Sequence, residues 1–292
     1  MKKFKIGIIG AENSHANYFA NLINMPDENG KLRFPDCHIS LVYSQYPDVC
    51  ENFVKEFGVD AIVNSVEEML QNVDAVMVTA RDGKYHYKFV KPFLEAGKPA
   101  FIDKPFTVDI NETKEIIKIA KKNNIPICGG SSLKFDKNIE ELKEFVEKNK
   151  ENIVGGNLAA PLLIENEYSG FFFYASHLTE MTLEVFGYNP LRISAFKNKN
   201  GVCATIEYEN YFVTNHFNDK VFQYSATVFS KEETKMEELK LEKIEEKEIY
   251  DFVNMLRTGK MTRTYEEYII PVYYMNAVKE SYEKGISVEF EL

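Results

Sequence analysis

A regular alternation of apolar strands and amphipathic helices dominates the first 128 residues of this chain. Phe4–Gly10 is a β-branched run that ends in glycine, and Ala75–Thr79 is another apolar run typical of a buried strand. Between such runs apolar residues recur at helical spacing, as in the segment Tyr18–Ile23. Strands that alternate with helices in this rhythm predict an α/β fold built on a doubly wound parallel sheet.

The same reading predicts the individual elements of this half. The helix expected over residues 85–96 stops before Gly97, a common C-terminal cap. The expected strands lie at 4–10, 38–43, 61–63, 75–79, 99–102 and 125–128, and the expected helices at 18–23, 49–57, 66–70, 85–96 and 109–123.

Beyond Gly129 and Gly130 the pattern changes. Residues 193–229 alternate in the manner of antiparallel strands and are dense in Tyr and Phe, which favours a sheet with one covered face. Helices are expected at 139–148, within 169–186, at 249–257 and at 265–284, and residues 231–247 form a solvated edge strand and helix start. We therefore predict two domains: a Rossmann-type domain over 1–128, and an α+β domain with a largely antiparallel open sheet over 129–292.

Composition limits the partners of the chain. Its net charge is -10, and its lysines are interspersed with acidic residues, so a nucleic acid is not the expected partner. The N-terminus lacks the apolar core of a signal peptide, and no later stretch has membrane-spanning length, so we expect a cytoplasmic protein without membrane contact. A small molecule is the expected ligand.

Cysteine and histidine spacing predicts neither a disulfide framework nor a metal site. The four cysteines lie far apart without a C-x-x-C pair, and the five histidines show no H-x-x-x-H spacing. The cysteines are best explained as small residues of the core.

The stretch Ala100–Val108 (AFIDKPFTV) carries the first candidate for chemistry. A short apolar strand delivers Asp103, Lys104 and Pro105 to the place where the strand ends, and ligands bind at strand C-termini in open parallel sheets. Pro105 biases Lys104 toward an extended conformation on a stiff backbone. The alternative is an ordinary surface lysine at a strand-to-loop junction.

Several blocks together resemble the Gfo/Idh/MocA family of glucose-fructose oxidoreductases and inositol dehydrogenases. The blocks are the N-terminal KIGIIGAENSHA, the segment VMVTARDGKYHYKFVKPFLEAGKPAFIDKP, the helix YASHLTEMTLEVFG and the C-terminal FVNMLRTGK and AVKESYEKG. The central block has D-K-P where the family usually shows E-K-P. It is the most specific of these, since a glycine-rich turn alone is weak evidence.

The resemblance implies a nicotinamide-binding Rossmann domain, with NAD or NADP as cofactor, and hydride transfer at a secondary alcohol of a sugar or polyol. By position, Lys104 corresponds to the family's active-site lysine and His177 to the histidine of its second-domain helix. A lysine can hydrogen-bond a developing alkoxide, and a histidine can accept the proton. The candidate cofactor-binding residues are Gly10, Glu12, Asn13, Ser14, His15, Ser44, Gln45, Thr79, Ala80, Arg81 and Asp103, and the candidate substrate-binding residues are Lys104, Tyr174, His177 and Glu180.

The glycine turn departs from the family pattern. After Gly10, the fingerprint G-x-G-x-x-G has Glu12 and His15 at its second and third glycine positions. A carboxylate about 6 Å from a phosphate charge would oppose binding by roughly 3 kcal/mol at an effective dielectric near 20. Glu12 must therefore point away, bind a ribose hydroxyl, or mark a site that no longer takes a dinucleotide in the usual way. Asn13 and Ser14 are suitable caps for the helix that follows.

Two further positions differ from the family. After the second strand, Ser44 and Gln45 stand where an acidic residue usually binds the adenosine ribose, which leaves the choice between NAD and NADP open. In the second-domain helix Phe173 replaces the aspartate four positions before His177, while Glu180 lies on the same helical face and could polarise the imidazole.

Other residues have two readings each. Arg81 either faces the coenzyme or forms a loop salt bridge with Asp82, and His86 is expected to be structural. The aromatic run Phe171–Tyr174 either walls a substrate pocket or belongs to the core. Lys134 and Asp136 fall where the family has substrate-side residues.

The function expected from these features is an NAD(P)-dependent oxidoreductase. The alternative is a catalytically inactive family member that binds a metabolite or nucleotide as a sensor or partner protein. The aromatic second half favours a homodimer or homotetramer, although a helix of the same chain could equally cover the sheet.

Overall fold

The computed structural model describes residues 3–290 and divides into two compact units. The first unit comprises Met1–Thr107, Asn111–Gly130 and Glu245–Glu266, and the second comprises Val108–Ile110, Ser131–Ile244 and Glu267–Leu292. The expected boundary at residue 128 lies close to the observed one at Gly130. A single boundary, however, misses the return of Glu245–Glu266 to the first unit, because that segment completes the first unit's core.

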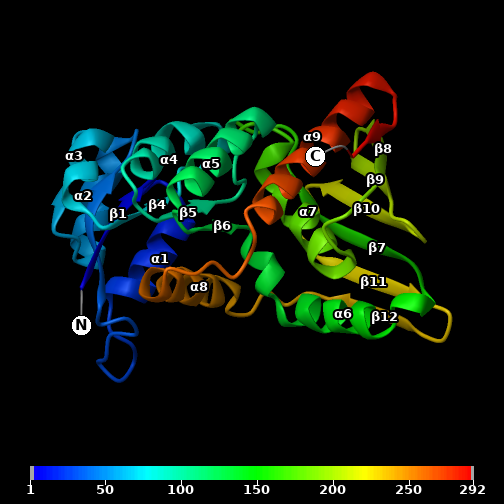
Figure 1. Ribbon diagram of the computed structural model, residues 1–292, viewed down its shortest axis with the longest axis horizontal. Coiled ribbons are helices and arrows are strands. Elements are labelled where there is room, and N and C mark those ends of the chain that lie inside the picture. The colour runs from blue at the N-terminus through cyan, green and yellow to red at the C-terminus, as the bar shows by residue number, and fades with distance from the viewer. Residues whose placement is uncertain (1–2, 291–292) are drawn as a thin grey trace. The chain divides into compact units, whose positions relative to one another are not determined.

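The first unit is a six-stranded sheet with helices on both faces (Figure 1). Its strands are β1 (Phe4–Ile9), β2 (Cys37–Tyr43), β3 (Ala61–Ile62), β4 (Ala75–Val78), β5 (Ala100–Asp103) and β6 (Ile127–Gly130). Its helices are α1 (Ser14–Asn24), α2 (Pro47–Phe57), α3 (Val66–Asn72), α4 (His86–Glu95), α5 (Ile110–Asn123) and α8 (Ile244–Thr258). The predicted alternation of strands and helices is thereby confirmed.

The strands of this sheet follow the order β3-β2-β1-β4-β5-β6, and each neighbouring pair is parallel. The order reverses between β1 and β4, so the crevice outside the carboxyl ends of these strands is the ligand site expected for a doubly wound sheet. Residues that follow β1, β2, β4 and β5 all lie at that edge.

One core joins β1 to the helices on one side of the sheet. Ile6 and Ile8 pack with residues of α1, α2 and α8. Phe101 of β5 meets Phe19 of α1 edge-on at 5.2 Å and Phe252 of α8 at 5.9 Å between ring centroids. Because α8 buries its apolar face here, the segment near residue 250 belongs to the first unit.

The second unit contains a seven-stranded sheet of order β12-β11-β7-β10-β9-β8-β13. Its pairs are antiparallel except β7 with β10, which is parallel, so the predicted largely antiparallel sheet is confirmed. The strands are β7 (Ile153–Leu162), β8 (Arg192–Asn198), β9 (Gly201–Glu207), β10 (Phe212–Asp219), β11 (Ser225–Ser230), β12 (Thr234–Glu238) and β13 (Val288–Glu289).

Strand β7 was not among the predicted elements. Its sequence IVGGNLAAPL contains two glycines and a proline, residues that are depleted in strands. It is nevertheless internal to the sheet, between β11 and β10. Gly156 is required there because a Cβ would lie 2.1 Å from the ring of Phe186, so packing against a helix outweighs local propensity.

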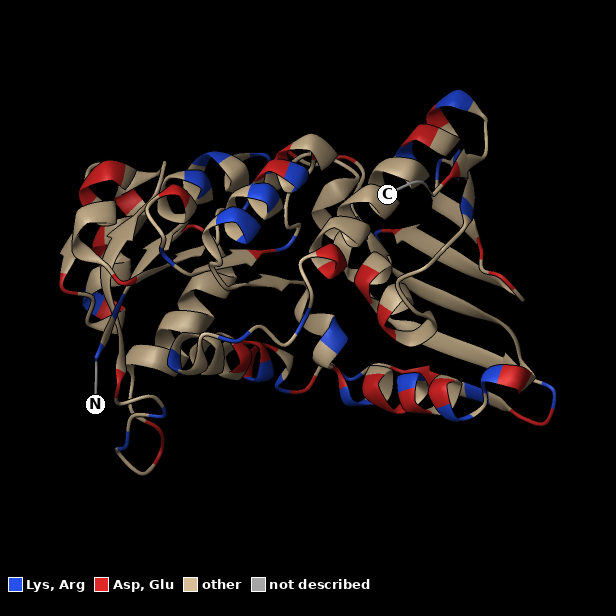
Figure 2. Cartoon of the chain, viewed as in Figure 1, with Lys and Arg blue, Asp and Glu red and all other residues tan. Residues whose placement is uncertain are grey.

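Three helices pack on one face of the second sheet: α6 (Lys137–Lys148), α7 (Phe172–Phe186) and α9 (Glu266–Lys284). Asn215 of β10 shows the contact with two of them, since its side chain bonds to Thr182 of α7 and to the hydroxyl of Tyr274 in α9. Charged residues concentrate on α6, whereas β7, β10 and β11 are almost without them (Figure 2).

Candidate active site

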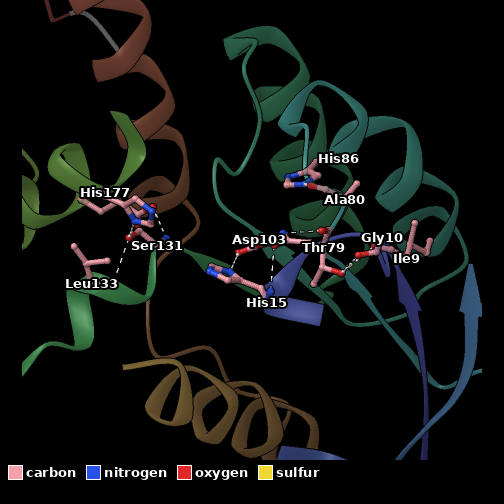
Figure 3. A network of polar contacts seen from close by, with 12 residues as sticks. Ile9, Gly10, His15, Thr79, Ala80, His86, Asp103, Ser131, Leu133 and His177 are labelled. Atoms are coloured by element: carbon pink, nitrogen blue, oxygen red, sulfur yellow. Dashed lines mark hydrogen bonds and ion pairs between the residues drawn. The ribbon is translucent and has the colours of Figure 1, made fainter. Parts of the chain in front are cut away.

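The turn between β1 and α1 lies against the residues that follow β4. Gly10 has φ +109°, and a Cβ at this position would lie 2.3 Å from the main-chain nitrogen of Ala80. The hydroxyl of Thr79 donates to the carbonyl oxygen of Ile9 at 3.1 Å and so fixes the two segments together (Figure 3). Gly10 thus fills the role of the first fingerprint glycine, because a positive φ and a close backbone approach both exclude a side chain.

Asn13 caps α1 and links it to two strands. Its Oδ1 accepts the main-chain N–H of His15 at 3.1 Å, while its Nδ2 donates to the carbonyl of Thr79 and to Oδ2 of Asp103, each at 2.9 Å. The predicted cap is therefore confirmed at Asn13, and Ser14 is an exposed residue of the first helical turn. The cap fixes the start of α1 over the ends of β4 and β5.

His15, at the third glycine position, pairs with Asp103. Its Nδ1 lies 3.0 Å from Oδ1 of the carboxylate, which is fully buried (Figure 3). Burial by itself would raise the pKa of Asp103, but the charge and hydrogen bond of His15, with Lys104 and His86 nearby, lower it to about 2. An ionised carboxylate therefore stands beside Lys104.

Replacing Asp103 by asparagine should lower the free energy of unfolding by about 2 kcal/mol near neutral pH. The pKa of this carboxyl in the folded chain, about 2, lies below its ordinary value of 3.8. Its contribution is therefore fully present above pH 3.8 and is lost as the pH falls through about 2. Urea titration of both proteins at several pH values measures the difference, which should shrink in acid.

The matched control for this comparison is Asp60→Asn. Asp60 also pairs with a histidine, since its Oδ1 lies 2.8 Å from Nε2 of His38, but both side chains are exposed. An exposed pair contributes about 0.2–1 kcal/mol at most, so this variant should unfold at nearly the wild-type urea concentration. An equal effect of the two substitutions would contradict the importance of the buried pair.

Glu12 extends to the end of β2. Its Oε2 accepts the hydroxyl of Ser44 at 2.6 Å, and its Oε1 accepts the main-chain N–H of Arg81 at 3.1 Å. Gln45 is exposed. These contacts turn the carboxylate toward the ends of β2 and β4, which is compatible with two of the three expected outcomes, a side chain that points away from the pyrophosphate and one that binds a ribose hydroxyl.

Lys104 is buried, with 7% of its surface exposed, which excludes the interpretation as a surface lysine. Burial lowers its pKa from the ordinary 10.5, and the charge of Arg81 acts in the same direction, whereas Asp103 and Glu248 oppose the shift. The Lys104–Pro105 peptide is cis, and a Cβ on Gly83 would lie 2.4 Å from Cγ of Pro105, so the segment after β4 packs closely on the D-K-P turn.

The remaining candidates of the first unit, His86 and Arg81, lie in a segment held by hydrogen bonds and an ion pair. His86 is fully buried, and its Nε2 lies 2.7 Å from the carbonyl oxygen of Ala80, which agrees with the structural role expected of it. Asp82 pairs with Lys84 at 2.7 Å. Lys84 is thus one ionic partner of Asp82, and the main chain of Arg81 donates to Glu12.

In the second unit a polar network surrounds His177 on α7. The imidazole Nδ1 lies 2.7 Å from Oγ of Ser131, and this hydroxyl oxygen also accepts the N–H of Leu133 at 3.2 Å (Figure 3). Glu180 accepts the N–H of Ser131 at 2.6 Å and forms a buried ion pair with Lys134 at 2.9 Å. Ser131 thus links His177 to Glu180.

Ser131 was missed by sequence reasoning. It is 46 positions from His177, and a lone serine after two glycines has no motif of its own. The available signal was its place directly after the last strand of the parallel sheet, at the edge where polar residues gather. Lys134, a candidate from the resemblance, pairs with Glu180, and Asp136 caps α6.

The aromatic run before His177 is divided between core and site. Phe171, Phe172 and Phe173 are buried, with 4–8% of their surface exposed, as expected of core residues. Tyr174 is half-buried, and its ring meets that of His177 edge-on at 5.8 Å. Of the four rings, Tyr174 is therefore the one with a described contact to the candidate catalytic histidine.

Residues 3–290 contain neither a membrane-spanning helix nor a cluster of metal-binding side chains. No helix in this range is both long and apolar enough to cross a membrane. No group of three or more His, Cys, Asp or Glu side chains in the same range is arranged to hold a metal ion. The four cysteines are free thiols.

The chain is similar in sequence to an oxidoreductase family and to several relatives. Residues 4–128 match the family model GFO_IDH_MocA, described as "Oxidoreductase family, NAD-binding Rossmann fold". The myo-inositol 2-dehydrogenase of Thermotoga maritima is 30% identical over 106 residues, which cover 34% of this chain and 31% of that enzyme. The chain thus matches about a third of that relative's length.

Two solved structures resemble the whole chain. GenD2 from gentamicin A biosynthesis, in complex with NAD, superposes with a TM-score of 0.85 at 12% identity and covers 100% of this chain and 97% of its own. The scyllo-inositol dehydrogenase of Lactobacillus casei, with bound NAD(H) and scyllo-inositol, has a TM-score of 0.82 at 17% identity and covers 99% of each chain. At these identities the likeness establishes the fold.

Proposed function

We propose that the chain is a member of the Gfo/Idh/MocA oxidoreductase family, whose model matches residues 4–128, and that it is an NAD(P)-dependent oxidoreductase acting on a sugar, polyol or related metabolite. The reaction is hydride transfer to or from a secondary alcohol or ketone. The observation that supports the proposal most directly is Lys104, a buried amine at the carboxyl end of a strand in a doubly wound sheet. The inositol dehydrogenases among its relatives support the substrate class.

The first unit has the features that a dinucleotide requires. Gly10 permits the close turn, and Asn13 orders the start of α1. The order of the strands reverses between β1 and β4, where dinucleotides bind in such sheets. In this proposal Thr79, Ala80, Arg81 and the β1–α1 turn hold the coenzyme, whose nicotinamide supplies or accepts the hydride. His15 takes the place of a glycine but is drawn toward Asp103.

The two candidate catalytic groups have distinct tasks in the proposal. Lys104 donates a hydrogen bond to the oxygen that becomes an alkoxide, and its lowered pKa brings proton exchange closer to neutral pH. His177 transfers the proton at Nε2 when its other nitrogen donates to Oγ of Ser131. Lys104 belongs to the first unit and His177 to the second.

Coenzyme titration tests the proposal. NADH and NADPH are added to the intact protein while fluorescence and melting temperature are followed, and a panel of inositols and sugars is then screened with NAD⁺ and NADP⁺ by coenzyme absorbance. Saturable binding and turnover are the expected results. Absence of any response to either coenzyme would leave the second candidate, a catalytically inactive metabolite-binding relative, which the altered residues Glu12 and His15 favour.

We further propose that a second copy of the chain covers the open face of the second sheet. Strand alternation places Phe196, Phe212, Phe229 and Met236 on the face opposite α7, with exposed fractions between 38% and 75%. Rows of small uncharged residues lie between them, including Asn157, Thr214 and Thr205. This face also carries the ion pair of Arg192 with Glu207, on β8 and β9. Exposed apolar side chains among small polar residues suit a self-complementary interface.

Light scattering on the purified protein should give a mass that is a multiple of the chain's own. Phe212→Asp should lower this mass to that of one chain, because it buries a charge in the contact, while Glu67→Gln on α3 should leave it unchanged. A wild-type monomer would contradict the proposed interface.

The free cysteines agree with a reducing compartment, so a cytoplasmic location is part of the same proposal.

A further inference from the structure

We propose that Glu12 selects NAD over NADP by supplying the ribose-binding carboxylate that β2 lacks at its end. The inference rests on the proposed function, since it requires that a dinucleotide binds. It assigns to a residue of the β1–α1 turn a task that usually belongs to an acidic residue at the end of the second strand.

The contact between Glu12 and Ser44 places the carboxylate at the required position. Oε2 of Glu12 lies 2.6 Å from Oγ of Ser44, the residue that directly follows β2. A serine hydroxyl has one hydrogen to donate, and here Ser44 directs it to Glu12 while its oxygen accepts the N–H of Tyr46 at 3.0 Å. Ser44 therefore orients the carboxylate, and the acceptor at the end of β2 is Glu12.

The carboxylate retains acceptor capacity for a ligand. A carboxylate offers about four lone-pair positions. Two are used in the described contacts, one by Ser44 and one by the main-chain N–H of Arg81 at 3.1 Å. The 2′- and 3′-hydroxyls of the adenosine ribose of NAD can donate two hydrogen bonds, one to each of the two remaining lone-pair positions. The site therefore suits this ribose.

A 2′-phosphate would meet the same carboxylate as a like charge. At about 6 Å and an effective dielectric near 20, each pair of unit charges lowers the affinity by about a hundredfold. The phosphate also lacks the hydrogen that the ribose hydroxyl donates. NADPH is disfavoured for both reasons, although Ser44 and Gln45 by themselves carry no charge against it.

The same contacts explain how the turn can tolerate an acid near a pyrophosphate. Glu12 is tied to the ends of β2 and β4, whereas the cap residue Asn13 and the imidazole of His15 are tied to Asp103 at the end of β5. The acidic side chain is thus held toward β2 and apart from the contacts that order the start of α1.

Calorimetric titration of the full chain with NADH and NADPH tests the inference. Wild type should bind NADH about a hundredfold more tightly than NADPH. Glu12→Gln should narrow this ratio at least about tenfold, mainly through tighter NADPH binding, and raised salt should narrow the wild-type ratio in the same direction. Ser44→Ala should narrow it less. Melting temperatures verify that each variant is folded.

Glu51→Gln is the matched control, because it removes the same charge from an exposed position on α2 and should leave the ratio unchanged. A wild-type preference for NADPH, or a ratio unchanged in Glu12→Gln, would overturn the inference and leave the proposed function standing. Binding that occurs only after Glu12 is replaced would show that Glu12 excludes dinucleotides, and would also overturn it. Failure of wild type and all variants to bind either coenzyme would overturn the proposed function itself.

Discussion

Replacing Lys104 by alanine should reduce kcat by about 100- to 1,000-fold and leave the Kd for reduced coenzyme within about threefold of wild type. The side chain stands at the end of β5, buried, and its ammonium group is the donor proposed to stabilise the alkoxide. The effect should fall on kcat because the alkoxide develops in the transition state. Stopped-flow measurement of hydride transfer, with coenzyme titration beside it, gives both quantities.

The pH profile separates a chemical role of Lys104 from a structural one. Its pKa is lowered by burial and Arg81, so activity that requires the protonated amine should fall with rising pH sooner than for an ordinary lysine. Glu248 acts against this shift, and Glu248→Gln should move the alkaline limb to still lower pH.

Three variants control for folding and charge. Lys104→Met fills the space without a donor and should be as inactive as Lys104→Ala. Lys104→Arg keeps the charge in a group that does not deprotonate and should lose the alkaline limb. Lys88→Ala removes an exposed lysine of α4 and should behave as wild type. Wild-type turnover by Lys104→Ala would remove this residue from the mechanism.

Replacing His177 by asparagine should reduce kcat by about 100- to 10,000-fold, the usual contribution of general acid–base catalysis. His177 is held on a buried helix with its Nδ1 2.7 Å from Ser131 Oγ, and the proposed mechanism assigns proton transfer to its other ring nitrogen, Nε2. Asparagine retains a polar side chain, so the loss reports the missing proton transfer more than a change of packing. Steady-state kinetics across the pH range provide the measurement.

Ser131→Ala distinguishes positioning from catalysis at this site. Because Ser131 bonds to the imidazole, its loss should shift the acid limb of the kcat profile and lower kcat less than His177→Asn does. Glu180 should act through the same serine, whose N–H it accepts at 2.6 Å. An acid limb identical in Ser131→Ala and wild type would contradict the link.

The candidate residues were predictable where local pattern and strand position coincide. Lys104 follows an apolar strand and precedes a proline, so its place at the edge of a parallel sheet could be inferred from the order of residues alone. Asn13 could be identified as a helix cap for the same reason. Both inferences depend on neighbours in the chain, and the structure agrees with both.

Other features depend on residues that are distant in sequence. Strand β7 was missed because its glycines and proline oppose strand formation locally, while neighbouring strands and Phe186 impose it. Helix α8 was expected to belong to the second domain, because that domain was predicted to span 129–292. In the structure its Phe252 packs on Phe101 in the first unit. No periodicity within either segment contains this information.

The sequence by itself determined the alternation that makes a doubly wound sheet, the glycine that closes its first turn, and the lysine at the end of its fifth strand. These follow from hydrophobic periodicity and backbone sterics, which act over a few residues. Only the tertiary structure decided where Glu12 points, since its two described partners, Ser44 and the main chain of Arg81, lie 32 and 69 positions away in the sequence. A charged side chain goes where donors can solvate it, and those donors are brought together by the packing of strands rather than by their order in the chain.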